Sequence, residues 1–223
     1  MFLRLSHTIN AATPTSSDSV VPVAIHPIER IERGDRSNLS RVELTNHYGT
    51  HLDAPNHFNA SGRRLVDFPI GDFVFERPVV VDIRQGDMGL IRAADLSRRA
   101  EAIDGHDLLL LRTGFSYLRA DDPERYRQRG PGVSDEAAHY LLDRFPCLRA
   151  LGMDFISLEW TSDLSHGFAA HHTFLQDNDR PFILIEDMTL EIGQRELRRV
   201  YAFPLLFDDL DSFPCTVVGE ALE

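Results

Sequence analysis

Three short runs of mostly apolar residues constrain the fold of this chain more than any other feature of its sequence. They span residues 79–83, 108–111 and 182–185. Nearly unbroken runs of this kind are typical of strands that are covered on both faces of a sheet. Helices must supply that cover, and the clearest one begins after the capping residue Ser134 and ends before Pro146. Strands that alternate with only two or three helices predict an α/β fold with a mixed sheet.

Weaker patterns complete the expected order of elements. Further strands are expected over residues 2–9, 20–28, 41–46, 148–155, 201–207 and 215–218, and a second helix over 92–100. In the strand over 41–46, the alternation of apolar and polar residues places Val42 and Leu44 inward. The polar segments 10–19 and 161–170 are expected to be loops.

The composition is that of a folded, acidic protein. Hydrophobic residues make up 43% of the chain and no low-complexity linker divides it, so we expect a single domain over residues 1–223. The net charge of −12 disfavours nucleic acid and anionic membranes as partners. All 23 basic residues are Arg, which excludes a catalytic Lys. We expect Cys147 and Cys215 to be buried thiols in a reducing compartment. Since we also find no signal peptide and no membrane-spanning run, a cytoplasmic location is expected.

Residues 47–57 hold the strongest indication of function. The segment contains three His and one Asp, together with a Gly and a Pro that disfavour a regular helix. In an extended chain, residues two apart share a face, so His47, His51 and Asp53 point the same way. His57 can join them after the turn at the Pro. Imidazole and carboxylate groups that converge bind Zn²⁺, Mn²⁺ or Fe²⁺, a better explanation than a polar loop with unrelated histidines.

Two positions late in the chain extend this hypothesis. Glu186 directly follows a buried strand, and a charge there needs a partner, either one of the arginines or a metal ion. His171 and His172 follow the expected polar loop. Residues at strand ends can converge in space, so these positions and the 47–57 segment together predict a metal centre. We interpret His139, inside the expected helix, as structural or exposed.

The eleven-residue segment resembles the signature of a known family. It matches every fixed position of the pattern His-X-Gly-Thr-His-X-Asp-X-Pro-X-His of the metal-dependent cyclase family, which includes bacterial kynurenine formamidase and isatin hydrolase. Shorter similarities lie at residues 5–7, 112–114, 132–134, 152–154, 170–172 and 185–186. The resemblance implies a swivelling β/β/α type of fold, in which a single domain has a barrel-like mixed sheet and few helices.

The resemblance also implies the roles of individual residues. The metal ligands that it implies are His47, His51, Asp53, His57, His171 and Glu186. In two-metal members of the family Asp53 would bridge the ions, whereas in one-metal members His57 and His171 would be the catalytic acid/base groups. Glu186 stands where the one-metal branch has Gln, and its negative charge favours two ions, Zn or Mn. His172 is the alternative to His171 as the downstream ligand.

By this resemblance the chain is an arylformamidase-like, metal-dependent amidohydrolase. Its small-molecule substrate would be an N-formyl aromatic amine or a cyclic amide such as isatin, attacked by metal-activated water. The early loop at residues 12–17 lacks the Trp that is common in formamidases of the family, which disfavours N-formylkynurenine itself. Alternatives on the same site are a cyclase or dehydratase, a lactone hydrolase and a non-catalytic binding protein. The resemblance further implies a homodimer or homotetramer, with the early loop as a candidate contact.

Six aromatic residues are candidates for the wall of the substrate pocket. They are Phe58, Phe115, Tyr117, Phe155, Trp160 and Phe168. Ordinary core packing explains each of them as well.

Overall fold

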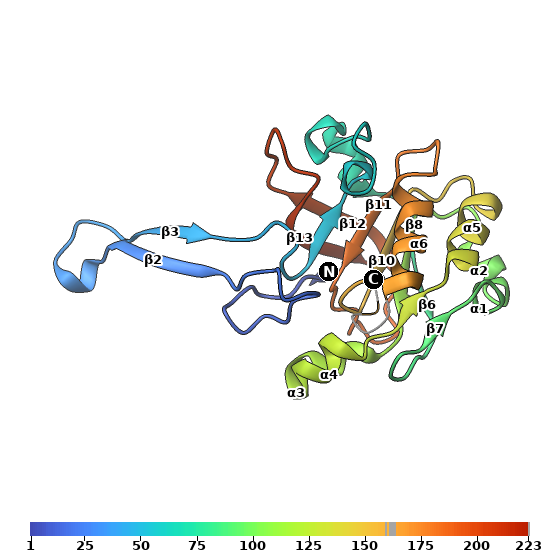
Figure 1. The fold of residues 1–223 in the computed structure, drawn as a ribbon, viewed down its shortest axis with the longest axis horizontal. Helices are drawn as coiled ribbons and strands as arrows, with labels where there is room; N and C mark the ends of the chain where they lie inside the picture. Colours follow the sequence, from blue (N-terminus) through green and yellow to red (C-terminus); the bar gives the residue numbers. More distant parts are fainter. Residues whose placement is uncertain (159, 161–163, 223) are drawn as a thin grey trace.

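The computed structural model describes residues 1–158, 160 and 164–222, and its centre is one large mixed sheet (Figure 1). In this described part of the chain, nine strands form the sheet. Their order is β5 (Val74–Phe75), β12 (Leu197–Pro204), β13 (Ser212–Ala221), β4 (His51–Asp53), β11 (Ile183–Glu186), β10 (Ala150–Met153), β8 (Leu108–Arg112) and β6 (Pro78–Asp82), with β1 (Phe2–Arg4) paired to β13. Outside the sheet, β7 (Leu90–Ile91) and β9 (Gly132–Val133) form a short parallel pair.

The direction of the strands divides the sheet into two halves. Strands β6, β8, β10 and β11 run parallel to one another, whereas β4, β13, β12 and β5 join antiparallel to their neighbours. Strand β6 at one end of the path also contacts β12 near the other end, so the sheet is nearly closed. The prediction of an α/β fold with a mixed, barrel-like sheet is therefore confirmed.

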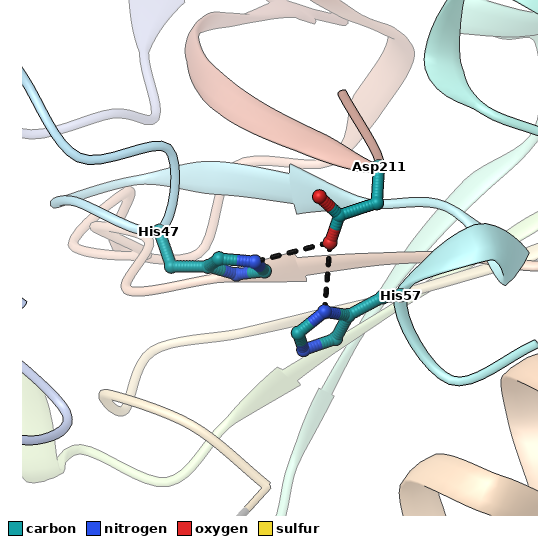
Figure 2. Close-up of side chains that lie close together, drawn as sticks. All are labelled: His47, His57 and Asp211. Atoms are coloured by element: carbon teal, nitrogen blue, oxygen red, sulfur yellow. Dashed lines mark hydrogen bonds and ion pairs between the residues drawn. The ribbon is translucent and has the colours of Figure 1, made fainter. Parts of the chain in front are cut away.

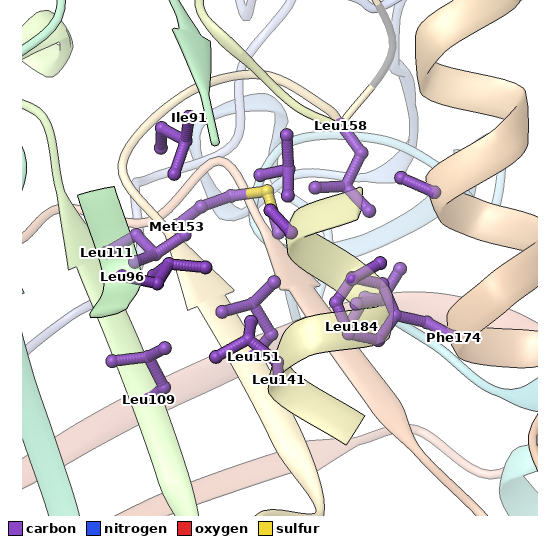
Figure 3. Packing of buried hydrophobic residues seen from close by; sticks show 14 of the residues in the cluster. Ile91, Leu96, Leu109, Leu111, Leu141, Leu151, Met153, Leu158, Phe174 and Leu184 are labelled. Carbon is purple, nitrogen blue, oxygen red and sulfur yellow. The ribbon is translucent and has the colours of Figure 1, made fainter. Parts of the chain in front are cut away.

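Two apolar cores lie on the two sides of the sheet, because successive residues of each strand alternate between its faces. Leu108 and Leu110 of β8 point into the nearly closed sheet, where the inner core includes Val217. Leu109 and Leu111 point the other way into an outer core that helices cover (Figure 3). Burial on both faces explains the apolar runs at 108–111 and 182–185, whereas β6, which comes from the run at 79–83, is last in the strand order and only partly buried.

The outer core is covered by α1 (Ala93–Ser97), α2 (Ala100–Ile103), α5 (Asp135–Arg144) and α6 (Leu164–Leu175), while α3 (Leu118–Asp121) and α4 (Pro123–Gln128) follow β8. Helix α5 begins as predicted, since Ser134 accepts a hydrogen bond from the amide of Ala137, and it ends before Pro146. The helix expected over 92–100 is instead divided between α1 and α2.

The loop expected over residues 161–170 is wrong for its greater part. Residues 161–163 lie outside the described residues, and the rest belongs to α6. Gly167 and the neighbouring histidines are weak helix formers, which obscured the helical period. Packing decides the conformation, because Ala170 and Phe174, one turn apart, are both fully buried in the outer core beside α5.

Strands β2 (Ala24–Glu29) and β3 (Leu39–Glu43) form a hairpin that projects far from the rest of the molecule (Figure 1). The inward orientation expected for Val42 is wrong, because this residue is 55% exposed. Ile25 pairs directly with Val42 and is equally open to solvent. The apolar residues that alternate in these two strands therefore do not pack on a core of the same chain.

The remaining expected strands are present with shorter or shifted bounds. Cys215 is buried as expected, but the prediction for Cys147 is wrong: it follows the turn at Pro146 and is exposed. Among the residues that the structure describes, none of the helices has the length and apolar character that a bilayer span requires.

Candidate metal centre

The register of β4 between β11 and β13 assembles the centre. His51 and Asp53 are two residues apart in β4, so both point to the outer face of the sheet while Leu52 points into the inner core. Glu186 pairs with His51 across the β4–β11 ladder. His171 comes from α6, and its Nε2 lies 3.4 Å from Oε1 of Glu186. The motif and the two downstream positions singled out by the sequence therefore meet.

His51 and Asp53 carry buried polar atoms without hydrogen-bond partners. Nδ1 of His51 donates to the carbonyl of Gly49 at 2.8 Å, which leaves a lone pair on Nε2. This Nε2 lies 3.4 Å from Oδ1 of Asp53 and 3.6 Å from Oε2 of Glu186. Nε2 of His51 and both carboxylate oxygens of Asp53 are buried and have no hydrogen-bond partner, although Oδ1 of Asp53 makes an ion-pair contact of 3.0 Å with Nδ1 of His47. Such atoms are costly in a folded protein unless a bound group satisfies them.

Five of the predicted donors form two overlapping groups that share Asp53, and the sixth, His57, forms a third group with His47 and Asp211. Of the two groups that share Asp53, one is His47, His51 and Asp53, and the other is Asp53, His171 and Glu186. Within each group the ligand atoms lie within 4.8 Å of one another. Imidazole nitrogens and carboxylate oxygens at this spacing are a suitable set for a divalent cation. The unpartnered atoms and the donor chemistry both fit a metal at this place.

The second carboxylate of the centre is held in place by its surroundings. Oε1 of Glu186 accepts hydrogen bonds from the hydroxyl of Ser157 and the amide of Leu158, both at 3.0 Å. Oε2 is left to face His51 at 3.6 Å. Supporting bonds of this kind orient metal ligands in known sites.

His57 lies beside these groups and contacts an acidic residue that sequence reasoning missed. It ends the short 3₁₀ turn Pro55–His57, and its Nδ1 lies 2.7 Å from Oδ2 of Asp211 (Figure 2). The same oxygen lies 3.1 Å from Nε2 of His47. In the sequence Asp211 stands just before a strand and is one of several acidic residues in the same loop, so nothing distinguishes it from its neighbours.

The electrostatics of the cluster follow from this geometry. Burial opposes protonation of His47, but the carboxylates of Asp53 and Asp211 outweigh it and raise the pKa of His47 to about 10. Burial likewise opposes ionisation of Asp53, yet the neighbouring imidazoles of His51 and His47 hold the pKa of Asp53 well below its usual value. Burial raises the pKa of the nearby Cys215 thiol, so a thiolate is not part of this centre.

The other two histidines considered from the sequence belong to none of the donor groups among the described residues. His172 contacts Gln176 at 2.8 Å and its ring lies 4.9 Å from that of Phe58, whereas His171 is the one that faces Glu186. The side chain of His139 is mostly exposed and lies near Asp135 on its own helix, as interpreted from the sequence.

Of the six aromatic candidates, two lie at the centre. The ring of Phe58 stacks on His171 with centroids 4.9 Å apart, and Phe168 lies 6.0 Å from Phe58. Phe115 and Phe155 are buried core residues, as the alternative explanation of the sequence required. The two that remain are Tyr117, which is exposed, and Trp160, which lies against Gly132.

Comparison with known proteins decides the family. A family model described as "Putative cyclase" matches residues 3–160, which is more than half of the chain. The chain belongs to the cyclase family. The matched region contains the 47–57 segment and ends before His171, Glu186 and Asp211, so it is the structure that places these three residues beside that segment.

Other members and neighbours of the cyclase family match nearly the whole chain. A kynurenine formamidase of Bacillus cytotoxicus is 24% identical over 187 residues, which are 84% of this chain and 82% of that protein. Isatin hydrolase A of Labrenzia aggregata has a TM-score of 0.83 at 19% identity, covering 98% of this chain and 93% of that one. A "predicted metal-dependent hydrolase" from Bacillus stearothermophilus has a TM-score of 0.75 at 22% identity, covering 98% and 97%. These structural matches establish the shared fold.

Proposed function

We propose that the protein is a metal-dependent hydrolase that acts on a small amide, such as an N-formyl aromatic amine or a cyclic amide like isatin. The observation that carries the proposal is the convergence of the unpartnered atoms of His51 and Asp53 with Glu186 and His171. Kynurenine formamidase and isatin hydrolase, which resemble this chain, support the substrate class.

The proposed ligands are His47, His51, Asp53, His171 and Glu186. Because Asp53 belongs to both donor groups, we propose two cations that share it. Mixed imidazole and carboxylate donors suit Zn²⁺ or Mn²⁺. When bound, such a cation polarises a carbonyl and acidifies water. The protein supplies rigid donors, since the carbonyl of Gly49 sets the tautomer of His51.

We assign proton transfer to His57. It belongs to neither donor group that contains Asp53, and its side chain is 27% exposed, whereas that of His171 is 3% exposed. A histidine with access to solvent can take a proton from an attacking water and return it to the leaving nitrogen. Phe58, which stacks on His171, and Phe168, which lies 6.0 Å from Phe58, offer aromatic surface on which an aromatic substrate can stack.

Elemental analysis and a substrate panel test the proposal. After dialysis the protein is expected to keep at least about one equivalent of Zn or Mn, a site of this kind being tight. It should hydrolyse N-formyl anilines or isatin, His57→Gln should lose that activity with metal retained, and His139→Gln should keep both. Less than about a tenth of an equivalent of metal, with no uptake on addition, would contradict the proposal. Turnover of lactones alone would redirect it to lactone hydrolysis.

We also propose that the protein forms a dimer through the β2–β3 hairpin. The pairing places Ile25 and Val42 on one face, whereas His26, Arg41 and Glu43 form an ion-paired opposite face. An antiparallel pair with one apolar face is typical of a sheet covered on that side, and a lone hairpin is marginal in water.

A second copy is the partner that we propose, because reciprocal exchange of two such arms buries on the order of 1,000 Å², near the lower limit for a specific interface. Light scattering is expected to show a dimer for the native protein and a monomer for Val42→Glu. Arg41→Glu, on the opposite face of the same strand, should remain dimeric. A native monomer at micromolar concentration would contradict the proposal.

A further inference from the structure

Asp211 is tied to the metal centre through both its backbone and its side chain. Its carbonyl accepts the amide of Ala54 at 3.0 Å, and Ser212, the next residue, pairs with Asp53 in the β4–β13 ladder. The carboxylate is therefore carried by the sheet itself, although its loop is long. Oδ1 of Asp211 accepts a hydrogen bond from the side-chain amide of Asn46 at 3.0 Å.

The other carboxylate oxygen is shared by two imidazoles. Oδ2 of Asp211 lies 2.7 Å from Nδ1 of His57 and 3.1 Å from Nε2 of His47 (Figure 2). An ionised carboxylate accepts hydrogen bonds and donates none, so His57 must carry a proton on Nδ1. In the neutral imidazole the lone pair is then on Nε2. The contact with Asp211 thus selects one of the two tautomers of His57.

The ring of His57 is also confined by its neighbours. Its centroid lies 4.1 Å from that of His47 and 4.6 Å from that of Phe58. The ring of His171 lies 6.2 Å away. Asp211 occupies the Nδ1 edge of His57 while these rings pack against the imidazole, so Nε2 is the ring nitrogen left for a reacting group.

We infer that Asp211 is the positioning residue of the proposed hydrolysis, because it holds His57 in the Nδ1–H tautomer with Nε2 ready to accept a proton. This inference depends on the proposed function. Nε2 takes the proton that water loses and delivers the same proton to the leaving nitrogen. Asp211 stays ionised and Nδ1 stays protonated through the whole cycle, so no other proton donor is required.

Nuclear magnetic resonance of zinc-loaded protein with ¹⁵N-labelled histidine tests the inference without any substrate. Long-range ¹H–¹⁵N correlations distinguish Nδ1–H from Nε2–H, and His57→Asn identifies the signals of His57 by their loss. The native protein is expected to show His57 with a protonated Nδ1 and a bare Nε2. Asp211→Asn should move His57 to the other tautomer or to a mixture, while the zinc content stays that of the native protein.

Kinetics of the same variants provide the second arm. Asp211→Asn is expected to lower kcat about 100-fold or more, with KM changed less than about threefold, as for loss of an oriented acid/base group. Asp209→Asn is the matched control, because Asp209 belongs to the same loop, is almost fully exposed and pairs with Arg64. It should behave as the native protein in both measurements.

Several results would overturn the inference. In the native protein, these are a proton on Nε2 of His57 or a metal ion bound to its Nδ1. In Asp211→Asn, they are an unchanged tautomer of His57 or a loss of zinc that the control Asp209→Asn does not show. If Asp211→Asn does not fold, Asn46→Ala, which removes the hydrogen bond to Oδ1, is expected to shift the tautomer in the same direction by less. Because the tautomer is read without substrate, failure of the proposed amide hydrolysis is distinguishable from failure of this inference.

Discussion

Two buried carboxylates, Asp53 in β4 and Asp187 directly after the neighbouring strand β11, are satisfied in opposite ways. Each is 1% exposed. Oδ1 of Asp187 accepts hydrogen bonds from Nε of Arg119 at 2.8 Å and from the hydroxyl of Tyr126 at 2.7 Å, and its Oδ2 accepts Nη2 of Arg119 at 2.7 Å. The oxygens of Asp53 have no hydrogen-bond partner, and their contacts are with imidazoles: Oδ1 lies 3.0 Å from Nδ1 of His47 and 3.4 Å from Nε2 of His51.

The two carboxylates differ in what compensates their negative charge, and this difference distinguishes a structural cluster at Asp187 from a candidate ligand site at Asp53. At Asp187 the chain itself supplies a permanent cation, the guanidinium of Arg119, so nothing further is needed. At Asp53 the chain supplies imidazoles, and the positive charge must come from a proton on His47 or from a metal ion. A buried acid that lacks a permanent cationic partner among convergent histidines is therefore the feature that distinguishes the candidate metal centre.

The sharpest test of this comparison replaces each carboxylate by its amide. Asp53→Asn is expected to lose essentially all bound metal, with hydrolysis falling about 10⁴-fold or more, because both donor groups depend on Asp53. Asp187→Asn should retain the metal, since its oxygens face Arg119 and Tyr126. Elemental analysis of both dialysed variants measures the difference. Equal metal loss in the two variants would break the comparison.

The next largest effect concerns stability. Arg119→Met leaves the buried carboxylate of Asp187 without its cation and with only the Tyr126 hydroxyl as a side-chain donor, so the free energy of unfolding should fall by about 3–5 kcal/mol. Arg64→Met, which removes an exposed pair with Asp209, should cost no more than about 1 kcal/mol. Urea unfolding of both variants gives the two values. If Arg119→Met lowered the free energy of unfolding no more than Arg64→Met does, Asp187 would not depend on its cation.

A smaller effect is expected from the residues that orient the metal ligands. Ser157→Ala removes the hydrogen bond to Oε1 of Glu186 and should weaken metal affinity about 10- to 100-fold. Ser212→Ala is the control, because the hydroxyl of Ser212 is buried nearby and has no hydrogen-bond partner among the described residues. Competition with a metal indicator measures both affinities, and similar values for the two variants would argue against this role of Ser157.

The last prediction concerns the change in the free energy of unfolding per pH unit, which only the metal-free protein should show. The pKa of His47 is about 10 in the folded chain, above its value near 6.5 in the unfolded chain, so the folded state binds the extra proton. Its contribution is complete below about pH 6.5 and is lost as the pH rises to about 10.

Unfolding measured from pH 7 to 10 should therefore show a free energy that falls by at most about 1.4 kcal/mol per pH unit. The slope should be absent in His47→Asn and in the metal-loaded protein, where a metal ion takes the place of the proton. Burial opposes the charge of Arg119, but Asp187 outweighs it and raises the pKa of Arg119. Arg119 therefore keeps its proton from pH 7 to 10 and does not contribute to the pH dependence of stability. An equal slope in His47→Asn would assign the proton elsewhere.

The sequence predicted the parts of this molecule that depend on local pattern. Unbroken apolar runs gave the strands at 108–111 and 182–185, and Ser134 gave the start of α5. The 47–57 segment gave His51 and Asp53 because residues two apart in a strand share a face whatever the rest of the fold does. His47 lies in the bend before β4, separated from it by the left-handed conformation of Gly49, so only the structure brings it to the same site. Resemblance to the cyclase family added His171 and Glu186, which no local pattern connects to that segment.

Where a residue's environment comes from another part of the fold, the sequence was insufficient. Packing on α5 made a helix of the expected loop before His171, and the absence of any core beneath the hairpin exposed Val42. Asp211 lies far along the chain from His57, and only the β4–β13 register brings the two together.

The chain by itself thus determined which chemical groups are available and which strands carry them, because side-chain type and the period of two are local properties. The tertiary structure decided which acid meets Arg119, which meets the histidines and which tautomer His57 adopts, because these outcomes depend on distances across strands that the order of residues does not contain.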